Sequence, residues 1–256
     1  MFKDVYAPLP DVGTYLRRIG IADEITGLTR ENLDRIIKNH LTHVPFENLD
    51  ECEDKACPEL GVSALYDKIV VRNRGGYCFE LNGALYALLK ALGYDAYCVA
   101  CRIRYGTDLI MPLSHRATIV TIDGKKYFCD VGYGGPSAQC SVPYDETVPG
   151  GFYIAQNGLD TQMRRKTDTG DELIMTYTDY PFDPVDFIPL NYYVALAPGS
   201  FFQMMPMINL TTENGSKTLN GDVFRCHENG QTTELKLGNE ELFKKVLRDE
   251  FGIIKE

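Results

Sequence analysis

The segment Arg74-Gly-Gly-Tyr-Cys-Phe-Glu-Leu-Asn82 constrains the fold more than any other part of the chain. Its two glycines permit a tight turn, and a leucine stripe at helical spacing runs from Leu81 to Leu92, just before Gly93. The pattern predicts that Cys78 opens an amphipathic helix. At a helix N-terminus, the macrodipole and the free backbone N–H groups stabilise a thiolate and can donate to an oxyanion. Taken alone, the segment fits a buried structural cysteine about equally well.

The rest of the chain divides into helical, strand-rich and mixed parts. Residues 1–92 show helical spacing of apolar residues, and Thr29 is a candidate cap for a helix that runs through Leu41. The middle of the chain is rich in β-branched and aromatic residues, and Asn239 is a candidate cap for a last helix. Strands are expected over 97–105, 116–122, 125–131, 152–155 and 173–177. We find no repeat and no low-complexity linker, so we expect the parts to pack as one body.

A nucleophilic cysteine needs a base, and the strand register supplies a candidate. The Asp-Gly pair at 123–124 is a strong signal for a two-residue hairpin turn, which pairs Ile122 with Lys125. Extended along both strands, this register makes Asp130 the diagonal, same-face neighbour of His115. Such neighbours lie about 7–8 Å apart, within reach of an imidazole and a carboxylate. A register slip of one residue would place the two side chains on opposite faces.

These residues together predict a Cys-His-Asp catalytic triad. His115 would accept the Cys78 proton, and Asp130 would fix the imidazole tautomer and favour the charged ring. Thiolates are strong nucleophiles for acyl carbonyls, so the predicted chemistry is acyl transfer through a thioester, either to an amine or to water. For His115 and Asp130 taken singly, a strand-edge histidine and a turn aspartate are the plainer interpretations.

The charge balance excludes some partners. The chain has 26 Lys and Arg against 36 Asp and Glu, which gives a net charge of −10. Nucleic acid and anionic membranes need a cationic surface, so neither is expected as a partner, whereas a small anionic ligand needs only a local positive site. The N-terminal sequence lacks the pattern of a signal peptide, and no apolar run approaches the roughly 18 residues of a membrane span. We expect a cytoplasmic protein.

The eight cysteines are even in number, but a disulfide framework is not expected. In a reducing compartment cysteines are mostly small buried hydrophobic residues. Cys98 and Cys101 have a CxxC spacing within a predicted strand, whereas a redox motif needs a strand-to-helix turn. Cys52 and Cys57 have no second ligand pair nearby, so no metal site is expected.

The segment around Cys78 resembles the active-site motif of the arylamine N-acetyltransferases. The segment His43-Val-Pro-Phe-Glu-Asn-Leu49 resembles that family's PFENL motif, and Asp130-Val-Gly-Tyr-Gly-Gly135 resembles its D-V-G-F-G motif. Further signatures are similar at Tyr15–Gly20, at Asn191 and at Ser200-Phe-Phe202. The similar segments follow the family's order from residue 15 to about residue 221, so the resemblance covers most of the chain.

The resemblance implies an α+β fold of a bacterial-type member of this family. A helical bundle (1–92) would carry the cysteine, a β-barrel (93–190) would carry the histidine and aspartate, and an α/β lid (191–256) would complete the chain. The catalytic core would be related to that of cysteine proteases and transglutaminases. The resemblance also implies a monomer or homodimer.

The resemblance further implies a ping-pong reaction with acetyl-CoA as co-substrate and no tightly bound cofactor or metal. Acetyl-CoA would acetylate Cys78, CoA would leave, and an arylamine or arylhydrazine would attack the thioester. By position, the acceptor pocket would be lined by Phe46, Phe79 and Tyr133. Contacts to CoA would come from Ser114, Gly132, Gly134 and Phe202.

Tyr133 departs from the family pattern, because it replaces the usual phenylalanine and adds a hydroxyl near the expected acceptor pocket. Three alternatives stay open from the sequence. A papain-like or transglutaminase-like hydrolase uses the same triad, an amide synthase of the same family uses another acyl donor, and a non-catalytic binding module would retain only the fold.

Overall fold

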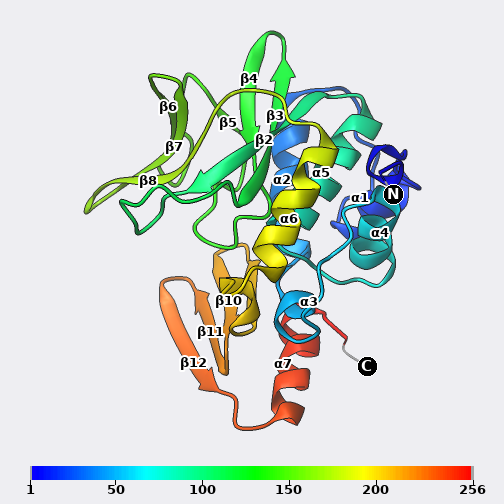
Figure 1. Ribbon diagram of the computed structural model, residues 1–256, viewed down its shortest axis with the longest axis vertical. Coiled ribbons are helices and arrows are strands. Elements are labelled where there is room, and N and C mark those ends of the chain that lie inside the picture. Colours follow the sequence, from blue (N-terminus) through cyan, green and yellow to red (C-terminus); the bar gives the residue numbers. More distant parts are fainter. Residues whose placement is uncertain (1, 255–256) are drawn as a thin grey trace.

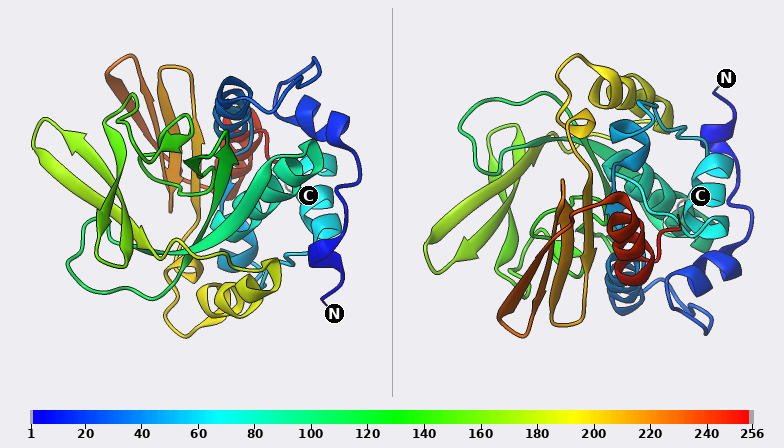
Figure 2. Two further views of the ribbon diagram at one scale, coloured as in Figure 1. Left: turned by 90° about the horizontal axis from the view of Figure 1, so that it is seen from above. Right: turned by 90° about the horizontal axis from the view of Figure 1, so that it is seen from below.

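The computed structural model describes residues 2–254 and places a group of helices beside two antiparallel sheets (Figure 1). Figure 2 shows the N-terminal segment and the hairpin of residues 160–177 on opposite sides of the molecule. The N-terminal part contains the short 3₁₀ helix η1 (Asp4–Tyr6), α1 (Val12–Arg18), α2 (Arg30–His43), α3 (Leu49–Cys52), α4 (Val62–Tyr66), the π-turn η2 (Asp67–Val71) and α5 (Cys78–Leu92). Most of the α5 side chains are buried, so this helix forms the centre of the main core.

The helix ends follow the expected capping chemistry. The Thr29 side chain accepts a hydrogen bond from the backbone of Asn32 at the start of α2, as predicted. Gly93 ends α5 in the left-handed conformation, with φ of 98°. The Asn239 side chain accepts from the Leu242 N–H and begins the last helix, which confirms that prediction as well.

The larger sheet has seven strands in the order β5-β4-β3-β2-β8-β7-β6. Its edge strands β5 and β6 contact each other, so the sheet is a nearly closed barrel. The strands are β2 (Asp95–Ile103), β3 (His115–Ile122), β4 (Lys125–Cys129), β5 (Val142–Pro143), β6 (Phe152–Asn157), β7 (Asp160–Thr167) and β8 (Gly170–Tyr177). Strand β7 has no clear signal in the sequence, because only Thr161 and Met163 of this mostly polar strand are buried.

The register of the β3–β4 hairpin is the predicted one. Ile122 pairs with Lys125, and the pairing continues to Thr118 opposite Cys129. The turn residues at 123 and 124 both have positive φ, 50° and 76°, as a tight hairpin turn of this hand requires. The barrel therefore carries His115 at the start of β3 and Asp130 directly after β4.

The smaller sheet has five strands in the order β1-β9-β10-β11-β12, and α7 (Glu240–Phe251) packs against it (Figure 1). Its strands are β1 (Phe46–Glu47), β9 (Met207–Thr211), β10 (Gly215–Asn220), β11 (Val223–Glu228) and β12 (Gln231–Lys236). Because β1 lies in the N-terminal part of the chain and pairs with β9, this sheet connects the N-terminal and C-terminal parts.

Along the chain, η3 (Pro184–Asp186), α6 (Phe187–Leu196) and η4 (Phe201–Gln203) come between β8 and β9. Helix α6 spans the boundary expected at residue 190, so the barrel and the C-terminal part are joined by a continuous helix. Among the residues that the structure describes, no helix is long and apolar enough to cross a membrane.

Candidate active site

Cys78 is the first residue of α5, as the sequence predicts, and its side chain is 3% exposed. The Glu80 carboxylate accepts a hydrogen bond of 3.0 Å from the backbone N–H of Tyr77 and so fixes the start of the helix. The turn before it needs glycine, because a Cβ on Gly75 would lie 1.9 Å from the Pro45 carbonyl oxygen. The local sequence thus places the sulfur at the positive end of a long helix.

His115 and Asp130 meet as the register argument predicts. The imidazole Nε2 lies 2.7 Å from a carboxylate oxygen of Asp130. The other ring nitrogen is then the one that can exchange a proton with Cys78. A hydrogen bond between the two side chains helps to raise the pKa of His115. The Cys78 Sγ lies 3.6 Å from the Ser114 carbonyl oxygen. The three side chains have the connectivity of a catalytic triad.

The mutual attraction of His115 and Asp130 and their hydrogen bonds shift both pKa values toward the charged forms, against the effect of burial. Burial alone would lower the pKa of His115, but the Asp130 carboxylate and the hydrogen bonds to Asp130 and Cys78 raise it to about 10. Burial alone would raise the pKa of Asp130, yet His115, the Asn82 amide and the Gly132 N–H lower it. The imidazolium–carboxylate pair is therefore the stable form at neutral pH.

Asn82 connects the nucleophile helix to the barrel, a role that sequence reasoning did not assign. Its amide nitrogen donates to Asp130 at 2.8 Å and to the Arg116 carbonyl at 2.6 Å, and its oxygen accepts from the Val131 N–H at 2.9 Å. Asn82 lies one helical turn after Cys78 on α5. That spacing within the motif is the signal that could have identified it.

Gly132 lets the barrel approach the helix closely. Its N–H donates to Asp130 at 2.9 Å, and a Cβ at this position would lie 2.9 Å from the Cys78 Cα. A larger residue would push the segment after β4 away from the nucleophile. Gly132 also lines the cavity described below, where the resemblance placed it as a CoA contact.

A buried ion cluster supports the start of α5. Lys68 lies 2.7 Å from both Glu80 and Asp50, and Arg74 donates to Glu47 at 2.7 Å and 2.9 Å. Glu47 and Glu80 are almost fully buried, so these ion pairs are structural rather than solvated. Arg18 lies beside the cluster and donates to the backbone carbonyls of Ile69, His43 and Arg74.

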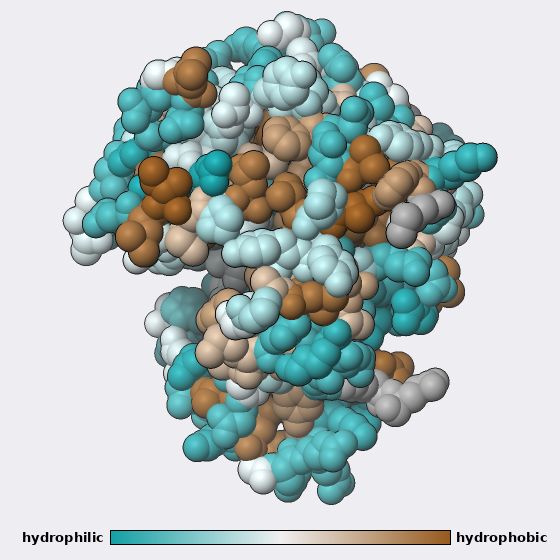
Figure 3. All heavy atoms as spheres, in the orientation of Figure 1, coloured by the Kyte–Doolittle hydropathy of each residue, from teal (hydrophilic) through white to brown (hydrophobic). Residues whose placement is uncertain are grey.

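A cavity of about 400 Å³ opens at the triad, between the two sheets. In the orientation of Figure 1, the space-filling view shows a notch between the upper body and the lower lobe (Figure 3). The cavity wall includes Cys78 and His115 and six of the seven further residues named from the resemblance: Phe46, Ser114, Gly132, Tyr133, Gly134 and Phe202. These residues come from five separate segments of the chain, which the fold brings to one place.

Phe79 corrects the expected acceptor pocket. Its side chain is fully buried and packs against Tyr77 and Phe187, with ring centroids 5.5 Å and 6.2 Å away, and it does not line the cavity. Adjacent helical residues point about 100° apart, so a cysteine that faces the cavity turns the next side chain into the core.

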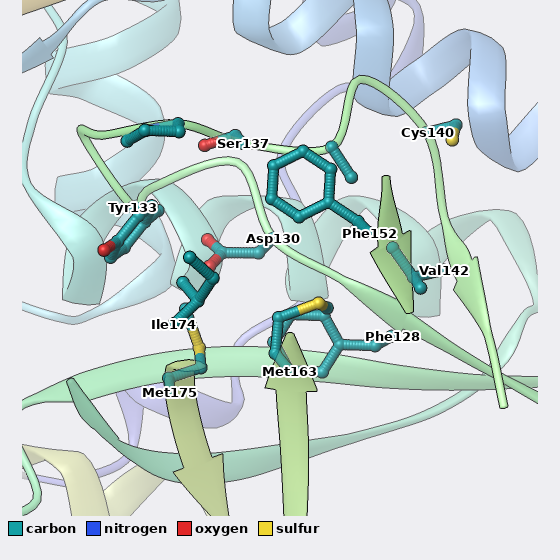
Figure 4. A pocket seen from close by; sticks show the side chains of 12 residues that line it. Phe128, Asp130, Tyr133, Ser137, Cys140, Val142, Phe152, Met163, Ile174 and Met175 are labelled. Atoms are coloured by element: carbon teal, nitrogen blue, oxygen red, sulfur yellow. The ribbon is translucent and has the colours of Figure 1, made fainter. Parts of the chain in front are cut away.

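Tyr133 lies edge-on to His115, with ring centroids 6.0 Å apart. On its other side is a small cavity of about 20 Å³ inside the barrel, which Phe128, Asp130 and Met163 also line (Figure 4). That space is about the size of a single water molecule, so it is too small for a substrate. Tyr133 and Asp130 thus separate the reactive cavity from the apolar barrel interior.

The smaller sheet forms a part of the cavity wall that was not predicted from the sequence. This part of the wall includes Met207, Ile208 and Asn209 of β9 and Thr218 and Asn220 of β10. No local motif marks these residues, because they reach the triad only through the pairing of β1 with β9.

Within residues 2–254, all eight cysteines are free thiols, and no cluster of His, Cys, Asp or Glu could hold a metal ion. Cys98 and Cys101 are both buried in β2, as the strand prediction requires.

Known proteins similar to this chain are acetyltransferases. The sequence model of a family described as N-acetyltransferase matches residues 29–255. Human arylamine N-acetyltransferase 1 is 31% identical, with 95% of this chain and 94% of the human protein aligned. An arylamine N-acetyltransferase from Mycolicibacterium smegmatis is 28% identical over 95% of this chain and 92% of its own length. The structure of the Mycobacterium marinum enzyme in complex with CoA has a TM-score of 0.86 at 26% identity, covering 95% of this chain and 93% of that one.

Proposed function

The chain belongs to the arylamine N-acetyltransferase family, and from this premise we propose how its residues carry out acetyl-CoA-dependent N-acetylation. The reaction is ping-pong, through an acetyl thioester on Cys78, with arylamines and arylhydrazines as acceptors. The 2.7 Å contact between His115 and Asp130, beside a cysteine at a helix N-terminus, is the observation that carries the proposal.

In the first half-reaction the Cys78 thiolate attacks the acetyl carbonyl carbon of acetyl-CoA. The free N–H groups at the start of α5 donate to the oxyanion that forms. When the tetrahedral species collapses, the bond to the CoA sulfur breaks, and the His115 imidazolium gives its proton to the departing thiolate. Free CoA leaves, and the enzyme holds an acetyl thioester beside a neutral imidazole.

In the second half-reaction the acceptor nitrogen attacks the thioester carbonyl. His115 takes the proton from that nitrogen, the bond to the Cys78 sulfur breaks, and the amide product leaves. The thiolate–imidazolium pair is restored, and Asp130 holds the ring in one orientation through both steps. Asp130 is a positioning residue, because it acts through His115.

The cavity wall supports an aromatic acceptor. Phe46, Tyr133 and Phe202 present rings to the space beside the triad, and Phe46 and Phe202 have centroids 6.4 Å apart. Aromatic faces favour an aromatic amine through offset or edge-to-face contacts. Ser114, Gly132, Gly134 and Phe202 are the proposed contacts to CoA, and the CoA complex of the M. marinum relative supports a CoA site in this fold.

Initial-rate kinetics test this proposal. Double-reciprocal plots at several acceptor concentrations should be parallel, because CoA leaves before the acceptor enters. Cys78→Ala and Cys78→Ser should both abolish acetyl transfer. Intersecting plots, or full activity in Cys78→Ala, would refute the thioester route. Release of acetate at the same rate with and without an acceptor would instead favour the hydrolase alternative.

The cytoplasmic location and the monomeric or homodimeric state stay predictions from the sequence.

A further inference from the structure

A second cavity lies away from the active site. Its volume is about 590 Å³, and it shares no lining residue with the cavity at the triad. The N-terminal segment, α4 and α5 form most of its wall. The N-terminal segment lies on the opposite side of the molecule from β7 and β8 (Figure 2). The proposed acetyl transfer makes no use of this space.

Arg116 is the residue that gives this cavity its chemistry. Successive side chains of a strand point to opposite faces, so His115 faces the triad cavity while Arg116 lines the second cavity. The Arg116 side chain is 2% exposed, and its guanidinium carbon lies 4.6 Å from the ring centroid of Phe187 and 5.6 Å from that of Tyr86. The two rings hold a fixed, buried cation at the cavity wall.

The hydrogen-bonding capacity of Arg116 is largely unused. Its Nη2 contacts the Cys98 sulfur at 3.1 Å, which is a weak acceptor, and its Nε is buried without a hydrogen-bond partner. Within residues 2–254, Arg116 forms no ion pair with a carboxylate. A buried cation without an opposite charge is costly, and an anion that entered the cavity would remove that cost.

The other lining residues indicate what kind of anion would fit. The wall contains a second cation, the exposed Lys90, and no Asp or Glu, although the chain as a whole has a net charge of −10. The remaining wall is mainly apolar and includes Leu9, Leu65 and Ala87. The cavity therefore combines one buried cation with an apolar surface long enough to hold a hydrocarbon group.

We propose that this cavity is a second ligand site, which binds a small amphipathic monocarboxylate. The carboxylate pairs with the Arg116 guanidinium, and the apolar part lies along Leu9, Leu65 and Ala87. A planar carboxylate matches the guanidinium fork, and its single negative charge balances the single buried cation.

Calorimetric titration of the full-length protein with octanoate tests the proposal, with saturating CoA present to occupy the active site. Octanoate should bind, and octan-1-ol, which has the same tail without the charge, should bind about tenfold or more weakly. Arg116→Met should weaken octanoate binding by a similar factor. Ala87→Leu keeps the cation but fills the cavity, and it should also weaken binding. Arg248→Met, on the exposed face of α7, is the matched control and should bind like wild type.

Three results would overturn the second site. They are no octanoate binding at millimolar concentration, equal binding of octanoate and octan-1-ol, and unchanged binding in folded Ala87→Leu. Thermal melting of each variant without ligand identifies a folding failure. If Arg116→Met does not fold, the Ala87→Leu and octan-1-ol comparisons still decide the question. None of these outcomes depends on whether Cys78 forms a thioester.

Discussion

At the scale of single residues, the Asp130 carboxylate connects three parts of the site. It accepts hydrogen bonds from His115, from the Asn82 amide and from the Gly132 N–H. One side chain therefore fixes the base, the nucleophile helix and the glycine segment relative to one another. Although Asp130 does not line the cavity at the triad, its charge raises the pKa of the base.

Asp130→Asn should slow acetylation of Cys78 by roughly 10³-fold or more, because an amide cannot stabilise the imidazolium and can select the wrong tautomer. Stopped-flow release of CoA, without acceptor, measures this step. Asp145→Asn is the control, since that carboxylate is exposed and pairs with the exposed Lys125. An Asp130→Asn rate within twofold of wild type would contradict the positioning role.

His115 makes stability depend on pH in a predictable direction. Its pKa is raised to about 10 in the folded protein, above the ordinary value of 6.5. The charged ring therefore contributes stability that is full below about pH 6.5 and is lost as the pH rises through about 10. This contribution is on the order of 5 kcal/mol. Chemical denaturation at pH 6, 8 and 10 should show the wild type losing more stability than His115→Gln; parallel losses would contradict the shift.

At the scale of elements, the β3–β4 hairpin and α5 together build the triad. The sequence sufficed for this part because the signals were local. The Asp-Gly turn set the register, and the leucine stripe after Cys78 set the helix. Phe79 was predicted to line the acceptor pocket but is buried in the core, because its position in a family motif does not show which way a helical side chain points.

Gly132→Ala tests how closely the two elements must approach. The added Cβ would lie 2.9 Å from the Cys78 Cα and 3.3 Å from the Cys78 carbonyl oxygen, so backbone must move. We expect a loss of about 1–3 kcal/mol in unfolding free energy, and a lower rate of Cys78 acetylation. Gly238→Ala is the matched control, because no atom lies within 4 Å of a Cβ built there. Equal stability and rates in both variants would contradict the close approach.

At the scale of the whole molecule, the active-site cavity exists only because distant parts of the chain meet. The β9 and β10 residues of its wall reach the triad through β1, which is two residues long and has no strand signature in the sequence. The second cavity could not be predicted from the sequence either, since nothing around Arg116 in the sequence shows that it lacks an acidic partner. Such features depend on packing between segments, which periodicity and turn signals do not encode.

The buried ion cluster joins the N-terminal segments around α5, and Lys68 is its central cation. Lys68→Met should cost about 3–5 kcal/mol of unfolding free energy, because it leaves the buried Glu80 and the partly buried Asp50 without that charge. Lys125→Met, which removes an exposed lysine paired with Asp145, should change stability by less than about 1 kcal/mol. Urea denaturation of the two variants measures the difference, and similar values would contradict a structural role for the cluster.

The central claim is that Cys78 carries the acetyl group between donor and acceptor. Intact-mass measurement after mixing the protein with acetyl-CoA, without acceptor, tests it most directly. We predict a gain of one acetyl group, which peptide mapping places on Cys78 and which disappears when an arylamine is added. No gain in mass in the wild-type protein, or an acetyl group on another of the eight cysteines, would contradict the account.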